Sequence, residues 1–195
     1  MTVEILSGPA MRPHLPELAR LRIAVFRDFP YLYDGDEASE ARYLDHFAAS
    51  PHAALVIARA GGEIVGCSTC QPLADQSESL VEPFRAAGIE PQRVFYVGES
   101  VLLAPYRGRG IGVAFFAARE AHAKSFNRYD LAAFCSVIRP ENHPLRPKSY
   151  VPLDAFWTRR GYTKRPDLIG RIAWKQVDSE DEVENELVFW TKPLR

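Results

Sequence analysis

The sequence predicts an α/β (α+β) protein with a single central β-sheet of six to seven strands. Short apolar, β-rich runs alternate with segments that repeat apolar residues every three or four positions, as amphipathic helices do. The chain has 195 residues, of which 47% are hydrophobic and 25% charged, and this suits a globular domain with a full core. Neither an internal repeat nor an interdomain linker is evident. We therefore expect residues 1–195 to form one domain.

The first half of the chain is expected to contain three strands and two helices. Leu15, Leu18 and Leu21 are spaced as one face of a helix, and Gly61-Gly62 is a typical hairpin turn between two apolar runs. The elements expected in order are a strand at 3–6, a helix from 15 to about 27, a helix at 38–48, and strands at 53–60 and 63–71. Residues 28–37 break the periodicity and are expected to form a loop.

The second half is expected to contain four strands and three helices. The run from Val94 to Leu103 is too apolar for an exposed edge, so we place it as one central strand. The elements expected in order are a short helix at 80–87, the strand at 94–103, a helix from 113 to about 127, a strand at 131–138, a helix at 153–160, and closing strands at about 171–177 and 186–193. Residues 139–152 are expected to form a proline-rich loop.

A glycine-rich basic loop, RGRGIG at 107–112, connects the central strand to the next helix. Residues without side chains let backbone N–H groups approach an anion closely, so this loop indicates a phosphate cradle. A P-loop needs Gly-Lys followed by Ser or Thr, which is absent, and a dinucleotide fingerprint needs its third glycine where Val113 stands. The alternative is a glycine-rich turn whose arginines are only solvated.

Two motifs give the chain a resemblance to a known family. Arg107, Gly110 and Gly112 match the pattern Arg/Gln-x-x-Gly-x-Gly/Ala after a strand, and residues 155–162, AFWTRRGY, are similar to a late signature A-x-L-Y-x-x-x-G-F. The chain therefore resembles the GNAT superfamily of acyl-CoA-dependent N-acyltransferases, and the order of its predicted elements agrees over essentially the whole length. The resemblance implies a mixed sheet flanked by helices on both faces.

The resemblance also implies how acetyl-CoA would be bound. The loop amides would hold the pyrophosphate, and the backbone of Val101 or Leu102 would bind the pantetheine arm and donate to the oxyanion of the reaction. Asn142, in the loop after the next strand, is a looser match to an asparagine that contacts coenzyme A. The expected coenzyme residues are thus Val101, Leu102, Arg107, Gly108, Arg109, Gly110, Ile111, Gly112 and Asn142. The side chains of the two arginines either add charge beside the phosphates or are solvated.

The chemistry needs a base, because only a neutral amine attacks a thioester. Glu99 has a position similar to the glutamate that many members of the family use, and the alternative is that it pairs with an arginine or points to water. In the late signature Trp157 replaces the tyrosine that serves as general acid, and an indole has no suitable proton to give. We expect Trp157 to pack, and Tyr150 or solvent, ahead of Tyr106, to protonate the leaving thiolate.

The resemblance implies that the acidic, aromatic loop at 28–37 forms one wall of the site that binds the acceptor amine. Its candidates are Tyr31, Tyr33, Asp34 and Asp36, and the alternative is that the tyrosines pack while the acids are solvated. A basic cluster of Arg139, Arg146 and Lys148 either recognises an anionic group or is solvated, and His143 beside it is expected at the surface.

Charge and cysteine usage exclude several other classes. Lys+Arg 24 against Asp+Glu 25 gives a net charge of -1, so neither nucleic acid nor an anionic membrane is an expected partner. Without a targeting pattern or a span-length apolar run, we expect a cytoplasmic protein. Cys67 and Cys70 form a C-x-x-C within a strand, where residues three apart face opposite sides, and Cys135 leaves the count odd. We expect packed thiols and no metal site.

The function expected from these observations is transfer of an acetyl group from acetyl-CoA to a primary amine by direct attack in a ternary complex. The expected acceptor is a small molecule, and a homodimer is compatible with the sequence. Two alternatives stay open: a catalytically silent acyl-CoA-binding or regulatory module, and a protein lysine or N-terminal acetyltransferase. An open groove would favour a protein acceptor, whereas a pocket closed by the 28–37 and 139–152 loops would favour a small molecule.

Overall fold

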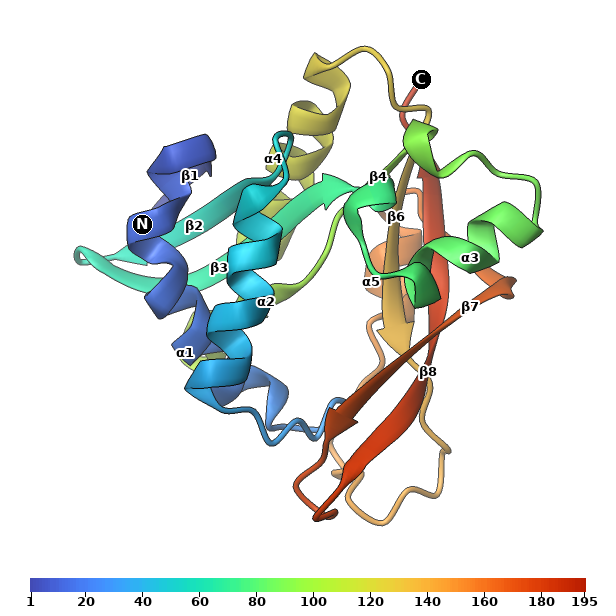
Figure 1. The fold of residues 1–195 in the computed structure, drawn as a ribbon. Coiled ribbons are helices and arrows are strands. Elements are labelled where there is room, and N and C mark those ends of the chain that lie inside the picture. The colour runs from blue at the N-terminus through green and yellow to red at the C-terminus, as the bar shows by residue number, and fades with distance from the viewer.

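The computed structural model describes residues 1–195 and contains one open, mixed β-sheet of eight strands (Figure 1). The strands are β1 (Thr2–Ser7), β2 (Ala54–Ala60), β3 (Glu63–Pro72), β4 (Val94–Tyr96), β5 (Ser100–Leu102), β6 (Leu131–Val137), β7 (Thr163–Lys175) and β8 (Glu182–Pro193). Their order across the sheet is β1-β2-β3-β4-β6-β8-β7, and β5 pairs with β3. Only β4 and β6 run parallel. The mixed sheet is confirmed, with more strands than the predicted six to seven.

Helices cover both faces of the sheet, as predicted. They are α1 (Leu15–Phe26), α2 (Glu37–Ala49), α3 (Glu78–Ala86), α4 (Ile111–Ser125) and α5 (Asp154–Thr158). In Figure 1, α1 and α2 lie in front of the β1–β3 half of the sheet and α4 lies behind it. The core is correspondingly divided: Leu55 and Ile57 pack under α1 and α2, whereas Val56 and Ala58 pack under α4. Every helix is too short or too polar to span a bilayer.

Local sequence signals explain why α1 and α2 form where predicted. Leu15, Leu18 and Leu21 are buried on one face of α1, and Pro16 stands in its first turn, where a missing N–H costs nothing. Asp36 is the N-cap of α2, because its carboxylate accepts hydrogen bonds from the backbone N–H of Ser39 at 2.9 Å and from the Ser39 hydroxyl at 2.8 Å. Asp36 therefore caps the helix, and its contact with an acceptor stays a prediction.

Four predicted elements differ from the structure. The expected single strand at 94–103 is two strands, because residues 97–99 leave the ladder between β4 and β5. The closing strands are longer than expected, since β7 begins at Thr163 and continues through a register shift between Arg165 and Ile169, where Pro166 disturbs the alternation. Helix α5 is shorter than the predicted 153–160.

The cysteines and Trp157 lie as the sequence indicated. Cys67 and Cys70 are both buried, and they belong to core clusters on opposite faces of the sheet. Burial raises the pKa of each thiol to about 12, which makes them inert near neutral pH. The Trp157 indole packs edge-on against Phe134 and Trp190, with ring centroids 5.1 and 5.2 Å away.

Candidate active site

The site is organised around the point where β4 and β6 separate. The two strands pair through Tyr96, and the last backbone bond between them runs from Val97 N–H to the Ala133 carbonyl at 2.8 Å. The chain then turns toward β3, where the Thr69 N–H donates to the Glu99 carbonyl at 3.0 Å. Beyond Val97, therefore, β5 pairs with β3 alone and its other edge has no strand partner.

The register of β5 decides which backbone groups lie on that unpaired edge. The Glu99 carbonyl and the Leu103 N–H both bond to β3, so by the two-residue alternation Val101 also faces β3 and Ser100 and Leu102 face away. The Leu102 carbonyl accepts a hydrogen bond from Arg107 Nε at 3.1 Å, consistent with this direction. Of the two predicted donors, Val101 thus directs its N–H to β3, whereas Leu102 lies on the free edge together with Ser100, which the sequence did not indicate.

Gly98 and Arg119 hold the chain in this irregular course. A Cβ at Gly98 would lie only 2.7 Å from Thr69 Oγ1, so the close approach requires glycine. The Arg119 side chain, from α4, is almost fully buried, and its Nη1 donates to the Gly98 carbonyl at 3.2 Å and to the Thr69 carbonyl at 3.4 Å. The helix that begins at the glycine loop therefore also fixes the separation of the strands.

The glycine loop has the geometry of an anion cradle. Gly108 and Gly110 have φ values of +75° and +81°, in the left-handed region that favours glycine, and Gly110 is the N-cap of α4. The first backbone bond of α4 runs from the Ala114 N–H to the Gly110 carbonyl, so the N–H groups of residues 108–113 have no backbone acceptor. These free donors and the positive end of the helix dipole suit a phosphate.

Glu99 lies in a buried cluster of charged side chains. Its Oε1 is 2.5 Å from Arg22 Nη1 without hydrogen-bond geometry, and its Oε2 accepts a hydrogen bond from the Tyr43 hydroxyl at 3.2 Å. Arg22 Nε donates to Glu40 Oε2 at 2.5 Å. The side chains of Arg22, Glu99 and Glu40 are 13%, 10% and 1% exposed, respectively. The structure thus shows the pairing with an arginine that the sequence left open, and a role for Glu99 as base stays a prediction.

Charges and burial set the ionisation of this cluster. Burial alone would lower the pKa of Arg22, but Glu99, Tyr43 and Glu40 together raise it above its ordinary value. Burial raises the pKa of Tyr43, and the charge of Glu99 raises it further. Burial likewise raises the pKa of Tyr33, with Glu40 as the next cause, which places Tyr33 beside the cluster. Arg22 is therefore cationic and the two tyrosines are neutral at physiological pH.

The loops at 28–36 and 139–152 are joined side by side at the lower end of Figure 1. Arg139 Nε donates to the Pro30 carbonyl at 2.7 Å, and Arg139 Nη2 donates to the Tyr31 carbonyl at 3.0 Å. The Tyr150 ring packs edge-on against Phe29 with centroids 4.7 Å apart. Neither predicted role of Arg139, recognition of an anionic group or simple solvation, describes this arrangement, because its side chain fastens one loop to the other.

The predicted acceptor residues of the 28–36 loop lie in different surroundings. Tyr31 packs against Phe26, and its pKa is raised first by burial and then by Cys135 and Glu99, so it lies close to the charged cluster. Asp34 instead pairs with Arg27 at 2.5 Å and Lys175 at 3.2 Å, and hydrogen bonds from both lower its pKa. Because its charge is compensated twice, Asp34 is a structural anchor, and its assignment as an acceptor contact is not supported by this geometry.

The remaining predicted residues lie on the 139–152 loop. Asn142 is exposed in a turn without a hydrogen-bond partner, and His143 is half-buried with its ring 5.6 Å from that of Phe29. Burial raises the pKa of Tyr150, so its hydroxyl is protonated, as a proton donor must be. Arg146 stands over the Tyr150 ring at 5.1 Å.

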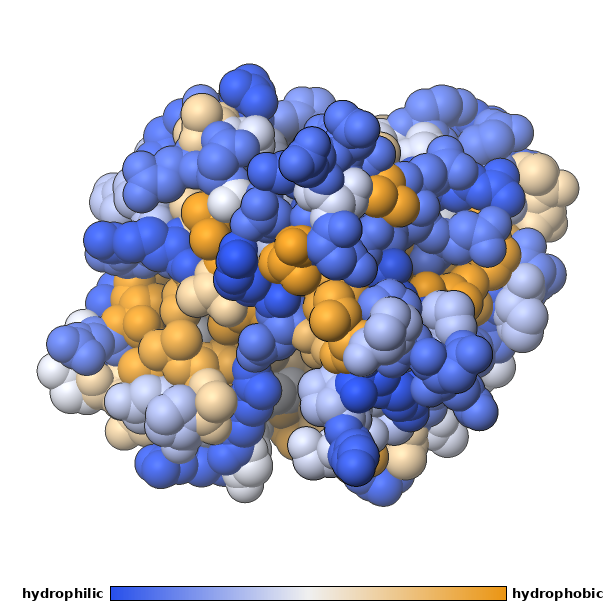
Figure 2. Space-filling model, turned by 90° about the horizontal axis from the view of Figure 1, so that it is seen from below, coloured by the Kyte–Doolittle hydropathy of each residue, from blue (hydrophilic) through white to orange (hydrophobic).

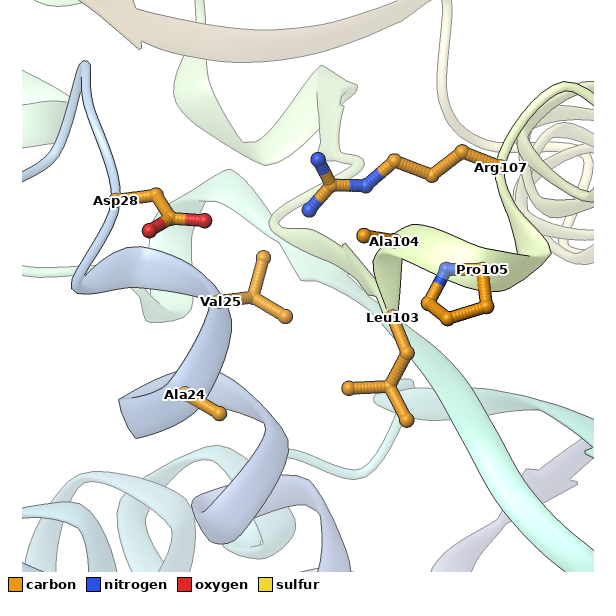
Figure 3. A pocket seen from close by; sticks show the side chains of 7 residues that line it. All are labelled: Ala24, Val25, Asp28, Leu103, Ala104, Pro105 and Arg107. Carbon is orange, nitrogen blue, oxygen red and sulfur yellow. The ribbon is translucent and has the colours of Figure 1, made fainter.

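A pocket of about 300 Å³ lies between the end of α1 and the segment leading into the glycine loop (Figure 3). Its apolar wall comes from Val25 and Leu103 among others, and the side chains of Asp28 and Arg107 point toward one another across it (Figure 3). The Arg109 guanidinium stands over the Tyr106 ring at 5.6 Å. The end of the molecule that carries the two loops is shown in Figure 2, where apolar residues gather in a patch at the left and hydrophilic ones cover most of the rest.

Sequence reasoning missed Arg22, Glu40, Tyr43 and Arg119. The two arginines stand on helix faces that are otherwise apolar: Arg22 between Leu18 and Phe26, and Arg119 between Phe115 and Ala123. A charged residue within a buried stripe is a usable signal, because such residues are rarely buried without a partner. The sequence alone does not identify the partner. No group of three or more His, Cys, Asp or Glu side chains is arranged to hold a metal ion.

Comparison with known proteins agrees with the fold. The profile of the acetyltransferase (GNAT) family matches residues 18–147, so the chain belongs to this family. A search of curated protein sequences found no match.

Solved structures with the same fold include several acetyltransferases. The ribosomal-protein-alanine N-acetyltransferase from Brucella melitensis aligns with a TM-score of 0.62 and 13% identity over 99% of both chains. The N-acetyltransferase from Staphylococcus aureus Mu50 aligns with a TM-score of 0.60 and 13% identity over 100% of both chains. An aminoglycoside 6'-N-acetyltransferase complexed with coenzyme A aligns with a TM-score of 0.58 and 16% identity over 100% of this chain and 98% of the other. At these identities the likeness concerns the fold alone.

Proposed function

We propose that the protein is an N-acetyltransferase that transfers an acetyl group from acetyl-CoA to a small-molecule primary amine in a ternary complex. The observation that carries this proposal is the continuity of one segment. Residues 99–113 present, in order, a buried carboxylate, backbone groups on an unpaired strand edge, and free N–H groups at a helix start. These are the three features that an acyl-CoA-dependent transfer to an amine needs.

The residues fit acetyl-CoA as co-substrate. The N–H groups of Gly108, Arg109, Gly110, Ile111 and Gly112 would hold its pyrophosphate, with Arg107 adding positive charge. The backbone of Ser100 and Leu102 would pair with the pantetheine arm, because that arm carries amides and the strand edge is free. When bound, acetyl-CoA supplies an acyl group activated as a thioester.

Glu99 would take the proton that the acceptor ammonium must lose. The neutral amine then forms a C–N bond to the acetyl carbon, and its nitrogen, cationic after the attack, loses a second proton to solvent. The C–S bond breaks, and the thiolate leaves with the electron pair of that bond. A backbone N–H on the free edge of β5 would stabilise the negative charge on the acetyl oxygen. Tyr150, neutral and on the same side as Tyr31, or solvent would protonate the thiolate.

The closed loops support a small acceptor. Arg139 ties residues 139–152 to the carbonyls of Pro30 and Tyr31, and loops fastened together in this way favour a small acceptor over an extended peptide. Tyr31 and Tyr33 lie beside the charged cluster around Glu99 and would contact a cationic amine. Asp34 is paired with Arg27 and Lys175, and Asn142 is exposed in a turn, so both are weaker candidates for ligand contact than the sequence suggested.

The silent binding module is the second candidate, because Trp157 replaces the usual tyrosine and Glu99 is paired with Arg22. One assay separates the candidates: release of free coenzyme A from acetyl-CoA with a panel of primary amines and lysine peptides. We expect turnover with small amines, and we expect Glu99→Gln to lower kcat about 100-fold or more while acetyl-CoA still binds, since a general base contributes on that order.

The other outcomes of this assay are equally distinct. Binding of acetyl-CoA by the wild type without turnover on any amine would establish the silent module. Acetylation of peptides in preference to small amines would establish the protein-directed enzyme. A Glu99→Gln variant with unchanged kcat would remove Glu99 from the mechanism.

A further inference from the structure

The charged cluster around Glu99 contains more negative than positive groups on its own face of the sheet. Two carboxylates, Glu40 and Glu99, share the single guanidinium of Arg22, each at 2.5 Å. All three side chains are almost buried, and a carboxylate as deeply buried as Glu40 usually has a cation to itself. The excess carboxylate therefore needs an explanation.

The groups that face Glu99 from other elements do not supply a second cation on this face. They are Tyr43 of α2, Tyr31 of the 28–36 loop, Tyr96 of β4, Cys67 of β3, Cys135 of β6 and Arg119 of α4. Burial raises the pKa of each of these tyrosines and cysteines, so they are neutral. Arg119 is cationic, but it approaches from the α4 side and is hydrogen-bonded to the carbonyls of Gly98 and Thr69.

We propose that Glu40 is a positioning residue that makes Glu99 a usable proton acceptor, by holding Arg22 while Glu99 takes up the proton. This inference rests on the proposed function, since it assigns the base of that reaction a partner. Glu40 acts through Arg22 and touches neither the acceptor nor acetyl-CoA.

The physical reason is the cost of an unpaired buried cation. If Arg22 had Glu99 as its sole partner, protonating Glu99 would leave a buried guanidinium uncompensated, and breaking a buried pair in this way is strongly unfavourable. With Glu40 present, Arg22 has a second carboxylate at 2.5 Å, which would remain its partner when Glu99 is protonated. A second carboxylate close by also favours proton uptake, because like charges disfavour joint ionisation. Arg119 is present whether or not Glu40 is, so it does not alter the difference that Glu40 makes to Arg22 and Glu99.

The test is a titration of the Glu99 carboxylate by NMR with ¹³C-labelled glutamate, the signal being assigned with Glu99→Gln. Replacing Glu40 by Gln keeps the side-chain shape and removes its charge. We expect the Glu99 titration midpoint to be lower in Glu40→Gln than in the wild type, because a neighbouring carboxylate favours proton uptake. An unchanged or raised midpoint would overturn the proposal.

A second variant distinguishes a charge effect from a packing effect. Tyr43→Phe removes a neutral donor that stabilises the ionised form of Glu99, so it is expected to raise the midpoint, opposite to Glu40→Gln. Shifts in the same direction for both variants would mean general disturbance of the cluster and would contradict the proposal. If Glu40→Gln does not fold, Glu40→Asp moves the charge back by one methylene and is expected to give a smaller shift in the same direction; no shift would count against the proposal.

The proposal also predicts a change in the pH dependence of catalysis, measured with an amine that the enzyme acetylates. In Glu40→Gln the acidic limb of the kcat/KM profile should move to lower pH and the plateau kcat should fall, while the KM for acetyl-CoA stays unchanged. A wild type that neither binds nor uses acetyl-CoA would refute the proposed function and leave the titration result intact. An unmoved midpoint in an active enzyme would refute the role of Glu40 alone.

Discussion

Gly98 shows at the scale of one residue how the site depends on contacts between strands. Its carbonyl accepts a hydrogen bond from buried Arg119, and its Cα lies so close to Thr69 that a Cβ would meet Oγ1 at 2.7 Å. This close approach lets the chain leave β6 after Val97 and pair with β3. The direction of the Glu99 side chain toward Arg22 follows from that turn of the backbone.

We predict that Gly98→Ala destabilises the protein by about 1–3 kcal/mol, because an added methyl in a packed site forces its neighbours to shift. Thr69 is buried and its short side chain has little freedom to move away. Unfolding by urea, followed by circular dichroism, measures the free energy of unfolding of wild type and variant. The same variant should lose acetyl transfer, since Glu99 is the next residue.

The double variant Gly98→Ala/Thr69→Ala is the control for this explanation. Removing Thr69 Oγ1 opens the space that the new methyl needs, so the two changes together should cost less than the sum of the single changes. Additive costs would show that the contact with Thr69 is not what excludes a side chain at position 98.

At the scale of an element, the 28–36 loop is held by ion pairs at its end. Asp34 pairs with Arg27 at the end of α1 and with Lys175 at the end of β7, and its backbone N–H donates to the Lys175 carbonyl at 2.8 Å. The loop is thereby joined to β7 as well as to Arg139. Both anchors keep Tyr31 and Tyr33 beside the charged cluster.

We predict that Asp34→Asn lowers the melting temperature at pH 6 and has a much smaller effect at pH 3. The hydrogen bonds from Arg27 and Lys175 depress the folded-state pKa of Asp34 below the ordinary 3.8. Its ionised form therefore stabilises the fold above about pH 3.8, and this contribution is lost as pH falls through the folded pKa. Thermal unfolding followed by circular dichroism at the two pH values measures the difference. An equal loss at both would mean that the charge of Asp34 plays no part.

At the scale of the whole molecule, the sequence was sufficient for the elements whose signals are local. Helices α1 and α2 follow from the three- and four-residue spacing of apolar residues, and the β2–β3 hairpin follows from Gly61-Gly62. The glycine loop was recognisable because its anion-binding geometry lies within six consecutive residues. These signals were enough to place both helices, the hairpin and the cradle.

The features that escaped sequence reasoning depend on residues far apart in the chain. The division of 94–103 into two strands requires Thr69 and Arg119, which no local pattern connects with Gly98. The charged cluster joins Arg22 to Glu40 across 18 positions and Tyr43 to Glu99 across 56. The resemblance left Val101 and Leu102 open as donors, because the edge toward which each backbone N–H points is unknown until the register with β3 is known.

The most direct measurement of the central claim is calorimetric titration of the protein with acetyl-CoA. We predict micromolar binding by the wild type and its loss in Gly110→Asp, because a carboxylate at the N-cap of α4 would stand in the cradle and repel phosphate. Gly88→Asp is the matched control: Gly88 also has a positive φ, +72°, with open space around a Cβ, and lies outside the cradle. Binding lost in Gly110→Asp and kept in Gly88→Asp would establish the site. No binding by the wild type, or unchanged binding in Gly110→Asp, would contradict the account.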